Sequence, residues 1–237
     1  MKIISLNIWR YDGNWQKRKP KIIEFIKKEN PDAIFLQEVF DDSRHNKLGN
    51  NQALQLNSEL KFKTLIYNIA EKLKTEHKQK INVLVFDGLA CLTNHKILNK
   101  GIIKLKKQFD DKHYRIIQKV KININGKNII FYHTHFSNRD DWAIIHLRET
   151  IKKAEKEKKL PIIIGDLNMI NTKDLTNNSK SKYKNSYEFK KYYSFPQKKE
   201  TLDYILIPKN NFKFIKVKCS TKGMSDHKAL IGVIEKK

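Results

Sequence analysis

The N-terminal stretch, residues 2–36, constrains the fold more than any other, because it reads as a strand, a helix and a second strand. Residues 2–9 alternate between polar and apolar side chains and are rich in isoleucine, as strands are. Isoleucines then recur at helical spacing in residues 16–29, before Asn30-Pro31 ends the helix. Residues 33–36 form a short apolar run that leads into Gln37 and Glu38. This order favours an α/β fold.

The rest of the chain is predicted to hold many strands and few helices. We expect helices at residues 50–60 and 139–159, and strands at 62–67, 81–86, 89–93, 160–164, 202–207, 212–217 and 229–234. A hairpin is expected from residues 113–124 and 127–135, because Asn125-Gly126 is a preferred two-residue turn. Asp87-Gly88 is expected to form a turn. No internal repeat or linker separates these segments, so residues 1–237 are predicted to form a single domain.

The charge balance is strongly basic. The chain has 237 residues, and its 49 Lys and Arg against 25 Asp and Glu give a net charge of +24. Such a charge favours an anionic partner, and nucleic acid is the partner that we expect. Compositional bias is an alternative explanation for part of the excess, since Lys, Asn and Ile are abundant along the whole chain.

Cysteine and apolar patterns exclude several classes of protein. Cys91 and Cys219 lie far apart without a second cysteine nearby, which disfavours a disulfide framework or a structural zinc site. No run approaches the roughly 18 apolar residues of a membrane span. Asn7, Arg10 and Asp12 interrupt the N-terminal apolar stretch, so no signal peptide is expected. We therefore expect, by default, a cytoplasmic monomer without an obligate protein partner.

Polar side chains gather where the predicted strands end. The apolar run at residues 160–164 releases the chain into Gly165-Asp166-Leu167-Asn168, which alone is equally typical of an ordinary turn. Matching groups stand at or past other strand ends: Asn7, Glu38, His135, Asp226 and His227. Asp203 lies within the strand pattern of residues 201–206, where a carboxylate needs a partner to be buried. Carboxylate ligands suit Mg²⁺, and a histidine oriented by a buried aspartate suits proton transfer, so these residue types favour metal-assisted hydrolysis.

Six of these segments carry a family resemblance. In chain order they resemble the motifs of the endonuclease/exonuclease/phosphatase superfamily, which includes nucleases, sphingomyelinases and inositol-polyphosphate phosphatases. The segments are Ser5-Leu6-Asn7-Ile8-Trp9, Phe35-Leu36-Gln37-Glu38-Val39, Thr134-His135-Phe136, Ile164-Gly165-Asp166-Leu167-Asn168, Leu202-Asp203-Tyr204-Ile205 and Ser225-Asp226-His227. The resemblance spans residues 5–227. It implies an α/β fold in which a two-sheet β-sandwich is flanked by helices, in four layers α/β/β/α, with the site at one edge.

The resemblance also implies roles. Glu38 is expected to be the principal ligand of Mg²⁺, or alternatively Mn²⁺, with Asn7 and Asp226 assisting. His227, oriented by Asp203, is expected to activate water or to stabilise the transition state.

In the same reading, Asp166 and Asn168 position the nucleophile and a phosphate oxygen, and His135 contacts the scissile phosphate. Which of Asp166 and His227 acts as the base stays open at this point.

Candidate substrate-binding residues are His133, Lys173 and Tyr183. His133 shares a strand face with His135, which fits a supporting or structural role equally well. Lys173 and Tyr183 belong to a basic, aromatic-bearing segment, residues 173–199, that suits phosphates and unpaired bases unless its aromatics are buried in the core. A nuclease is the favoured hypothesis. A phosphatase or phosphodiesterase for a small or lipid phosphate, such as an inositol phosphate or sphingomyelin, and an inactive binding module are the alternatives.

Overall fold

Twelve strands form two six-stranded sheets in the computed structural model, which describes residues 1–73, 83–111, 113–220 and 223–237. The first sheet has the order β11 (Phe212–Cys219), β12 (Leu230–Lys236), β1 (Lys2–Asn7), β2 (Ala33–Asp42), β4 (Val85–Thr93), β3 (Thr64–Leu73). The second has the order β5 (Lys96–Lys104), β6 (Ile116–Ile124), β7 (Lys127–His135), β8 (Ile162–Asp166), β10 (Asp203–Pro208), β9 (Tyr183–Asn185). The helices are α1 (Trp15–Glu29), α2 (Gln52–Leu60), α3 (Asp140–Ala154), α4 (Thr172–Ser179) and α5 (Ser186–Phe189).

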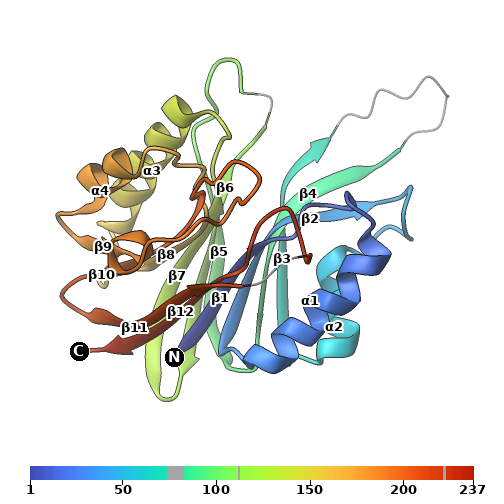
Figure 1. Cartoon of the computed structure of the whole chain (residues 1–237), viewed down its shortest axis with the longest axis horizontal. Helices are drawn as coiled ribbons and strands as arrows, with labels where there is room; N and C mark the ends of the chain where they lie inside the picture. Colours follow the sequence, from blue (N-terminus) through green and yellow to red (C-terminus); the bar gives the residue numbers. More distant parts are fainter. Residues whose placement is uncertain (74–82, 112, 221–222) are drawn as a thin grey trace.

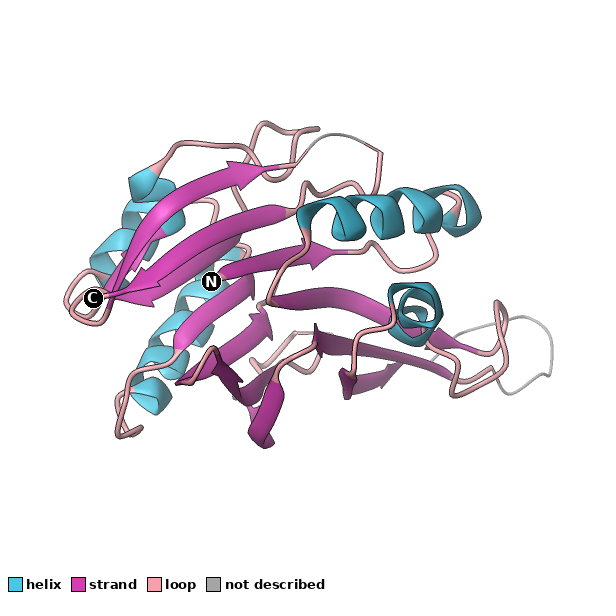
Figure 2. Cartoon of the chain, turned by 90° about the horizontal axis from the view of Figure 1, so that it is seen from below, coloured by secondary structure: helices cyan, strands magenta, loops and turns pink. Residues whose placement is uncertain are grey.

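Three apolar clusters hold four layers together. Between the sheets, alternate side chains of both interdigitate, among them Phe35, Phe131 and Ile164. The opposite face of the first sheet packs on α1 and α2, and that of the second sheet packs on α3. Figure 1 and Figure 2 show the two pairs of helices on opposite outer sides of the sandwich. The predicted four-layer α/β/β/α sandwich is therefore confirmed.

The predicted strand–helix–strand start is also confirmed. β1 and β2 pair in parallel, with Ile3 opposite Ala33, and α1 connects them across the outer face. The hairpin around Asn125-Gly126 pairs Ile124 with Lys127, as its turn predicted. Both turn residues have positive φ, 50° and 79°, which is the backbone that this turn type requires.

Other predictions were wrong or incomplete. Asp87 and Gly88 form no turn but lie within β4, opposite Phe40 and Val39. Gly88 is required there for space, because a Cβ would lie 2.4 Å from the carbonyl oxygen of Asn68 on β3. The edge strand β5, largely exposed and rich in lysine, was not predicted, and α3 ends at Ala154 instead of residue 159. The predicted strand at residues 81–86 lies partly outside the described residues, and its described part joins β4.

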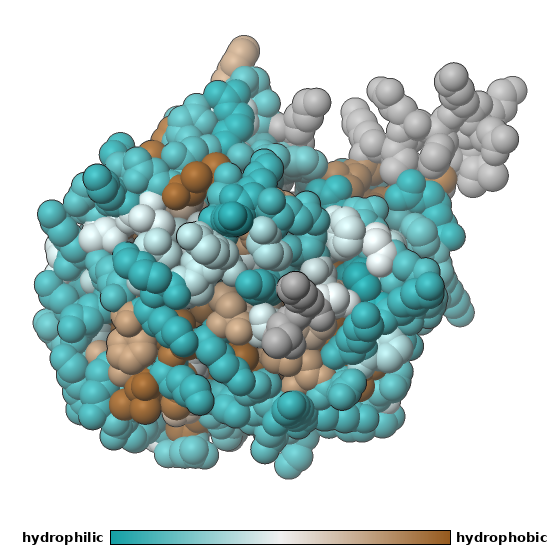
Figure 3. Space-filling model, viewed as in Figure 1, coloured by the Kyte–Doolittle hydropathy of each residue, from teal (hydrophilic) through white to brown (hydrophobic). Residues whose placement is uncertain are grey.

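Figure 3 shows a mostly hydrophilic face with small, scattered apolar patches, as the charge balance predicts. Among the described residues, no helix has both the length and the apolar character needed to cross a membrane.

Candidate active site

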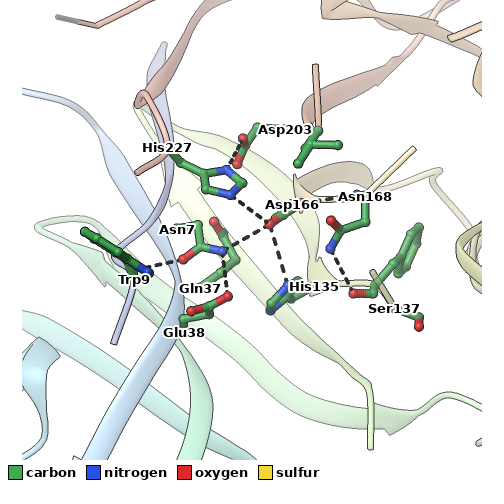
Figure 4. A network of polar contacts seen from close by, with 12 residues as sticks. Asn7, Trp9, Gln37, Glu38, His135, Ser137, Asp166, Asn168, Asp203 and His227 are labelled. Carbon is green, nitrogen blue, oxygen red and sulfur yellow. Dashed lines mark hydrogen bonds and ion pairs between the residues drawn. The ribbon is translucent and has the colours of Figure 1, made fainter. Parts of the chain in front are cut away.

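Asp166 is the centre of a polar network at one edge of the sandwich (Figure 4). It is the last residue of β8 and only 1% exposed. Its Oδ2 atom accepts a hydrogen bond from Asn7 Nδ2 at 3.1 Å and lies 3.6 Å from His135 Nε2 and 3.8 Å from His227 Nε2. The strand order explains this meeting, since β8 lies between β7, which ends at His135, and β10, which begins at Asp203.

The end of β8 needs the glycine of the sequence motif. Gly165 has φ +147°, and a Cβ there would lie 1.8 Å from the carbonyl oxygen of Thr134 on β7. Only glycine allows the two strands to approach so closely. Asn168 then adopts a left-handed backbone with φ 48°, donates its backbone N–H to Asp166 Oδ1 at 3.1 Å, and donates Nδ2 to the carbonyl oxygen of Phe136 at 3.2 Å. The motif thus fixes the orientation of the Asp166 carboxylate.

Asp203 and His227 form a buried pair. Asp203 is fully buried, and its Oδ2 lies 2.8 Å from His227 Nδ1. Its other oxygen, Oδ1, has no hydrogen-bond partner among the described residues. Ser194 Oγ accepts hydrogen bonds from the backbone N–H groups of Leu202 and Asp203, which anchors the start of β10. The pair therefore orients the imidazole so that Nε2 points at Asp166.

The pKa shifts of the buried site residues indicate which of them carry a proton at neutral pH. Burial lowers the pKa of His227, but the charges of Asp203 and Asp166 outweigh it and raise that pKa to about 10. Burial raises the pKa of Asp166 to about 7, against the opposing effect of His227. Burial and the charge of Arg115 hold the pKa of His135 well below its ordinary value. At neutral pH, His227 is an imidazolium, His135 is neutral and Asp166 is able to gain or lose a proton.

Glu38 reaches the network from a distortion of β2. The pairing of β2 with β4 shifts register between Leu36 and Val39, and Glu38 has a left-handed φ of 52°. Such bulges re-aim a side chain, and strained backbone of this kind concentrates at functional sites. Glu38 Oε1 accepts from Asn7 Nδ2 at 3.1 Å, and Oε2 accepts from Arg10 Nε at 3.0 Å. Asn7 therefore bridges the carboxylates of Glu38 and Asp166.

Arg18 fixes the loop that carries Arg10. This buried side chain on α1 donates hydrogen bonds to the carbonyl oxygens of Ile8, Trp9, Arg10, Asp12 and Met224. Trp9 and Arg10 both have left-handed backbone, with φ 56° and 46°. The same guanidinium therefore holds the strained loop after β1 and the loop that precedes His227.

The donor set fits a divalent cation. Glu38, Asp166 and Asp226 supply hard carboxylate oxygens near one another, and burial, with a contribution from Glu38, raises the pKa of Asp226. Asp166, Asp203 and His227 also bring ligand atoms within 4.8 Å of one another. Because the Asp203–His227 hydrogen bond already uses two of those atoms, Glu38, Asn7 and Asp226 are the residues that could hold a cation.

The three candidate substrate-binding residues are not brought to this network. His133 is fully buried between Gln37 and Gln118, at 2.6 Å and 2.9 Å, so it supports the interior of the sandwich and cannot contact substrate directly. Tyr183 is 2% exposed within the apolar cluster under α3, which is also incompatible with direct contact. Lys173 lies exposed on α4, and its side chain makes no hydrogen bond or ion pair with any described site residue.

Sequence reasoning missed Arg10, Arg18 and Asp87. Burial, with a contribution from the charge of Glu38, raises the pKa of Asp87 to about 7, which places a further acid close to Glu38. Arg10 follows Asn7 closely in the chain, so its proximity to the Asn7 motif was the one available signal.

The arrangement has a match among known families. The model of the Endonuclease/Exonuclease/phosphatase family matches residues 4–227. This chain belongs to that family. Its members hydrolyse phosphoric esters, so the chain is a phosphoric ester hydrolase. No curated protein sequence matches it.

Solved structures show the same fold at low identity. The endonuclease/exonuclease/phosphatase from Bacteroides vulgatus is 19% identical, with a TM-score of 0.79. The superposition covers 100% of this chain and 98% of that chain. The mannosyl-6-phosphatase of Bacteroides thetaiotaomicron is 18% identical with a TM-score of 0.75, with 99% of each chain covered. D. rerio TDP2, complexed with single-strand DNA product, is 16% identical with a TM-score of 0.72, over 99% of this chain and 98% of that one.

Proposed function

We propose that this protein hydrolyses phosphodiester bonds in nucleic acid with the help of Mg²⁺. The observation that carries the proposal is the convergence on Asp166 of a charged Asp203–His227 pair and an Asn7–Glu38 pair. The Asp203–His227 pair suits proton transfer and charge stabilisation, and the Asn7–Glu38 pair suits a cation. Metal-assisted hydrolysis of a phosphoester needs both.

The pKa directions favour Asp166 as the base. With a pKa of about 7, its carboxylate is able to accept the proton of an attacking water at neutral pH. His227, with a pKa of about 10, is already protonated and therefore stabilises the negative charge that develops on the phosphate. Asp203 keeps this imidazolium charged and oriented, and Asn168 and the neutral His135 lie beside Asp166, where phosphate oxygens bind.

Glu38, Asn7 and Asp226 would hold the cation, which when bound supplies positive charge to a phosphate oxygen. Arg10 fixes the second oxygen of Glu38 and so limits how that carboxylate turns. Mn²⁺, which also takes oxygen ligands, is the alternative ion.

Nucleic acid is favoured as the substrate by the net charge of +24. The D. rerio TDP2 structure, with its single-strand DNA product, shows that this fold accommodates such a strand in another protein. A small phosphate ester is the second candidate, since another protein of this fold is a mannosyl-6-phosphatase.

The test is a parallel substrate panel. The purified protein is incubated with Mg²⁺, Mn²⁺ or EDTA and with plasmid, single-stranded DNA, RNA, an inositol phosphate, mannose 6-phosphate or sphingomyelin. We expect cleavage of nucleic acid that EDTA abolishes. Turnover of only a small or lipid phosphate would replace the nuclease proposal by the second candidate. Salt-dependent binding of nucleic acid without any turnover would favour a binding module instead.

A further inference from the structure

Arg115 is a buried arginine that makes no hydrogen bond among the described residues, although the charge of Asp87 in the same hollow attracts it. It directly precedes β6 and is 8% exposed. Its side chain makes no hydrogen bond with any described residue, no described carboxylate lies within 4.0 Å of it, and its Nε atom is fully enclosed. Arg18, buried to the same degree, donates to five carbonyl oxygens. Because a buried guanidinium without hydrogen bonds is costly, Arg115 has the capacity to bind an anion that Arg18 lacks.

Arg115 lies at the same edge of the sheet as the network around Asp166. β6, β7 and β8 are neighbours in that order, and the β6–β7 pairing places Arg115 just beyond the end of β7, at His135. Arg115 and His135 line one narrow hollow together with Asp87, Gly88 and Tyr114. Two strand spacings, roughly 10 Å, separate Arg115 from Asp166. Arg115 is therefore placed for a phosphate other than the one beside Asp166.

The hollow has room for part of a phosphate only. Its volume is about 10 Å³, which suits a single water or one oxygen atom. One non-bridging oxygen is therefore able to reach the guanidinium while the remainder of the phosphate stays at the surface.

Tyr114 marks the mouth of this hollow with an exposed aromatic ring. Its side chain is 55% exposed, although Glu71 Oε2 accepts its backbone N–H at 3.1 Å and so fixes its position. Lys107 Nζ lies 4.2 Å from the ring centroid and adds positive charge. A fixed, exposed ring beside a cation is the arrangement on which unpaired bases stack.

We propose that Arg115 and Tyr114 form a nucleotide subsite beside His135, where Arg115 binds the phosphate next to the cleaved one and Tyr114 stacks on its base. The subsite rests on the proposed nuclease function and narrows its substrate to strands with unpaired bases. A duplex keeps its bases stacked inside the helix and leaves the ring of Tyr114 without a partner.

Two substrates separate the subsite from the chemistry. Bis(p-nitrophenyl) phosphate has one phosphate and no neighbouring nucleotide, whereas a single-stranded oligonucleotide offers both. Steady-state kinetics with Mg²⁺ are measured on each for the wild type, Arg115→Ala, Arg115→Lys, Tyr114→Ala and Tyr114→Phe. Arg148→Ala, an exposed arginine on α3 whose one side-chain hydrogen bond among the described residues is to Asn178, is the matched control.

We expect Arg115→Ala and Tyr114→Ala each to raise KM for the oligonucleotide about tenfold, the effect of roughly 1.4 kcal/mol and within the range of one stacked base. Arg115→Ala also lowers the dependence of log KM on log salt by about 0.7, the share of one phosphate contact in a single strand. Arg115→Lys and Tyr114→Phe keep most of the affinity. Both Tyr114 variants, Arg115→Lys and the control keep the wild-type kcat and KM on bis(p-nitrophenyl) phosphate. Arg115→Ala loses at most about twofold there at neutral pH, because burial, the larger cause, still keeps His135 neutral.

The two proposals fail in different ways. Oligonucleotide cleavage that Arg115→Ala and Tyr114→Ala leave unchanged overturns the subsite and spares the nuclease. An equal loss on both substrates, not restored by Arg115→Lys, shows a structural role for Arg115 and also overturns the subsite. A wild type that hydrolyses bis(p-nitrophenyl) phosphate but no nucleic acid overturns the proposed function and the subsite with it.

Discussion

The two halves of the active site are built in opposite ways. In the His227 half, Asp166 and Asp203 lie at the ends of β8 and β10 and pair in regular register, and His227 lies in the loop before β12, oriented by Asp203. The Glu38 half, with Asn7, Arg10 and Glu38, depends on left-handed backbone at Arg10 and Glu38 and on a register shift in β2. The first half is thus positioned mainly by regular strand pairing, with left-handed backbone only beside Asp166, at Gly165 and Asn168. In the second half the residues themselves have distorted backbone, which the hydrogen bonds of Arg18 and Arg10 fix.

This contrast predicts that the Glu38 half tolerates change least. In Glu38→Gln, the amide loses the charge that would bind the cation, so we expect kcat/KM to fall about a thousandfold, the effect of roughly 4 kcal/mol. Steady-state kinetics on an oligonucleotide over a range of Mg²⁺ concentrations measures the loss. Glu59→Gln, an exposed glutamate paired with Lys19, is the control and keeps wild-type activity. Full activity in Glu38→Gln would contradict the placement of the cation.

The next largest effect is expected in the His227 half. Wild-type kcat/KM should rise with pH through about 7, as Asp166 ionises, and fall near pH 10, as His227 loses its proton. In Asp203→Asn, the main charge that raises the pKa of His227 is gone, so the alkaline fall moves to lower pH and the rate drops about a hundredfold. A pH–rate profile of both proteins checks this. An unmoved alkaline limb would mean that His227 does not act as an imidazolium.

Arg18→Lys tests whether the hydrogen bonds of Arg18 are needed to fix the left-handed backbone of the Glu38 half. An ammonium has no planar fork and cannot reach carbonyls in two loops at once, so we expect a ten- to hundredfold loss, similar to that of other supporting residues around metal sites. The Mg²⁺ concentration for half-maximal rate should rise, while the alkaline limb of the pH profile stays in place. A lower melting temperature with an unchanged Mg²⁺ dependence would show that Arg18 stabilises the fold and does not position the cation site.

The smallest effect is expected outside both halves. Tyr183→Phe removes a buried hydroxyl that has no hydrogen-bond partner among the described residues. We expect activity within about twofold of wild type and a free energy of unfolding that is unchanged or raised by about 1 kcal/mol, since an unsatisfied polar group is lost. Urea denaturation and the oligonucleotide assay test this together. A large loss of activity would instead support a role for Tyr183 in substrate binding.

The same contrast explains what sequence reasoning was able to predict. Asp166 ends one apolar strand, Asp203 begins another, and His227 shortly precedes a third, and strand ends at one edge of a sheet meet wherever the pattern of strands is right. The strands and the α/β class followed from such apolar runs, whereas the two-sheet sandwich was implied by the family resemblance. Glu38 was expected past the end of its strand, but β2 continues to Asp42, and the bulge at Glu38 depends on its pairing with β4. Pairings between distant strands are not encoded in local spacing.

Burial was the other quantity that local patterns did not predict. The alternation of β7 places His133 and His135 on one face, yet His133 lies deep between the sheets and His135 at their edge. Tyr183 and Arg115 show the same effect, since neither a buried tyrosine nor a buried arginine without hydrogen bonds among the described residues has a local sequence signature.

The order of the site residues along the chain has a consequence in time. Asn7 emerges early in synthesis, whereas His227 follows every other site residue, and the strand beside β1 that completes the first sheet is β12. The Asp203–His227 pair therefore cannot form until His227 has left the ribosome. A nascent chain whose His227 has not yet left the ribosome is therefore catalytically silent.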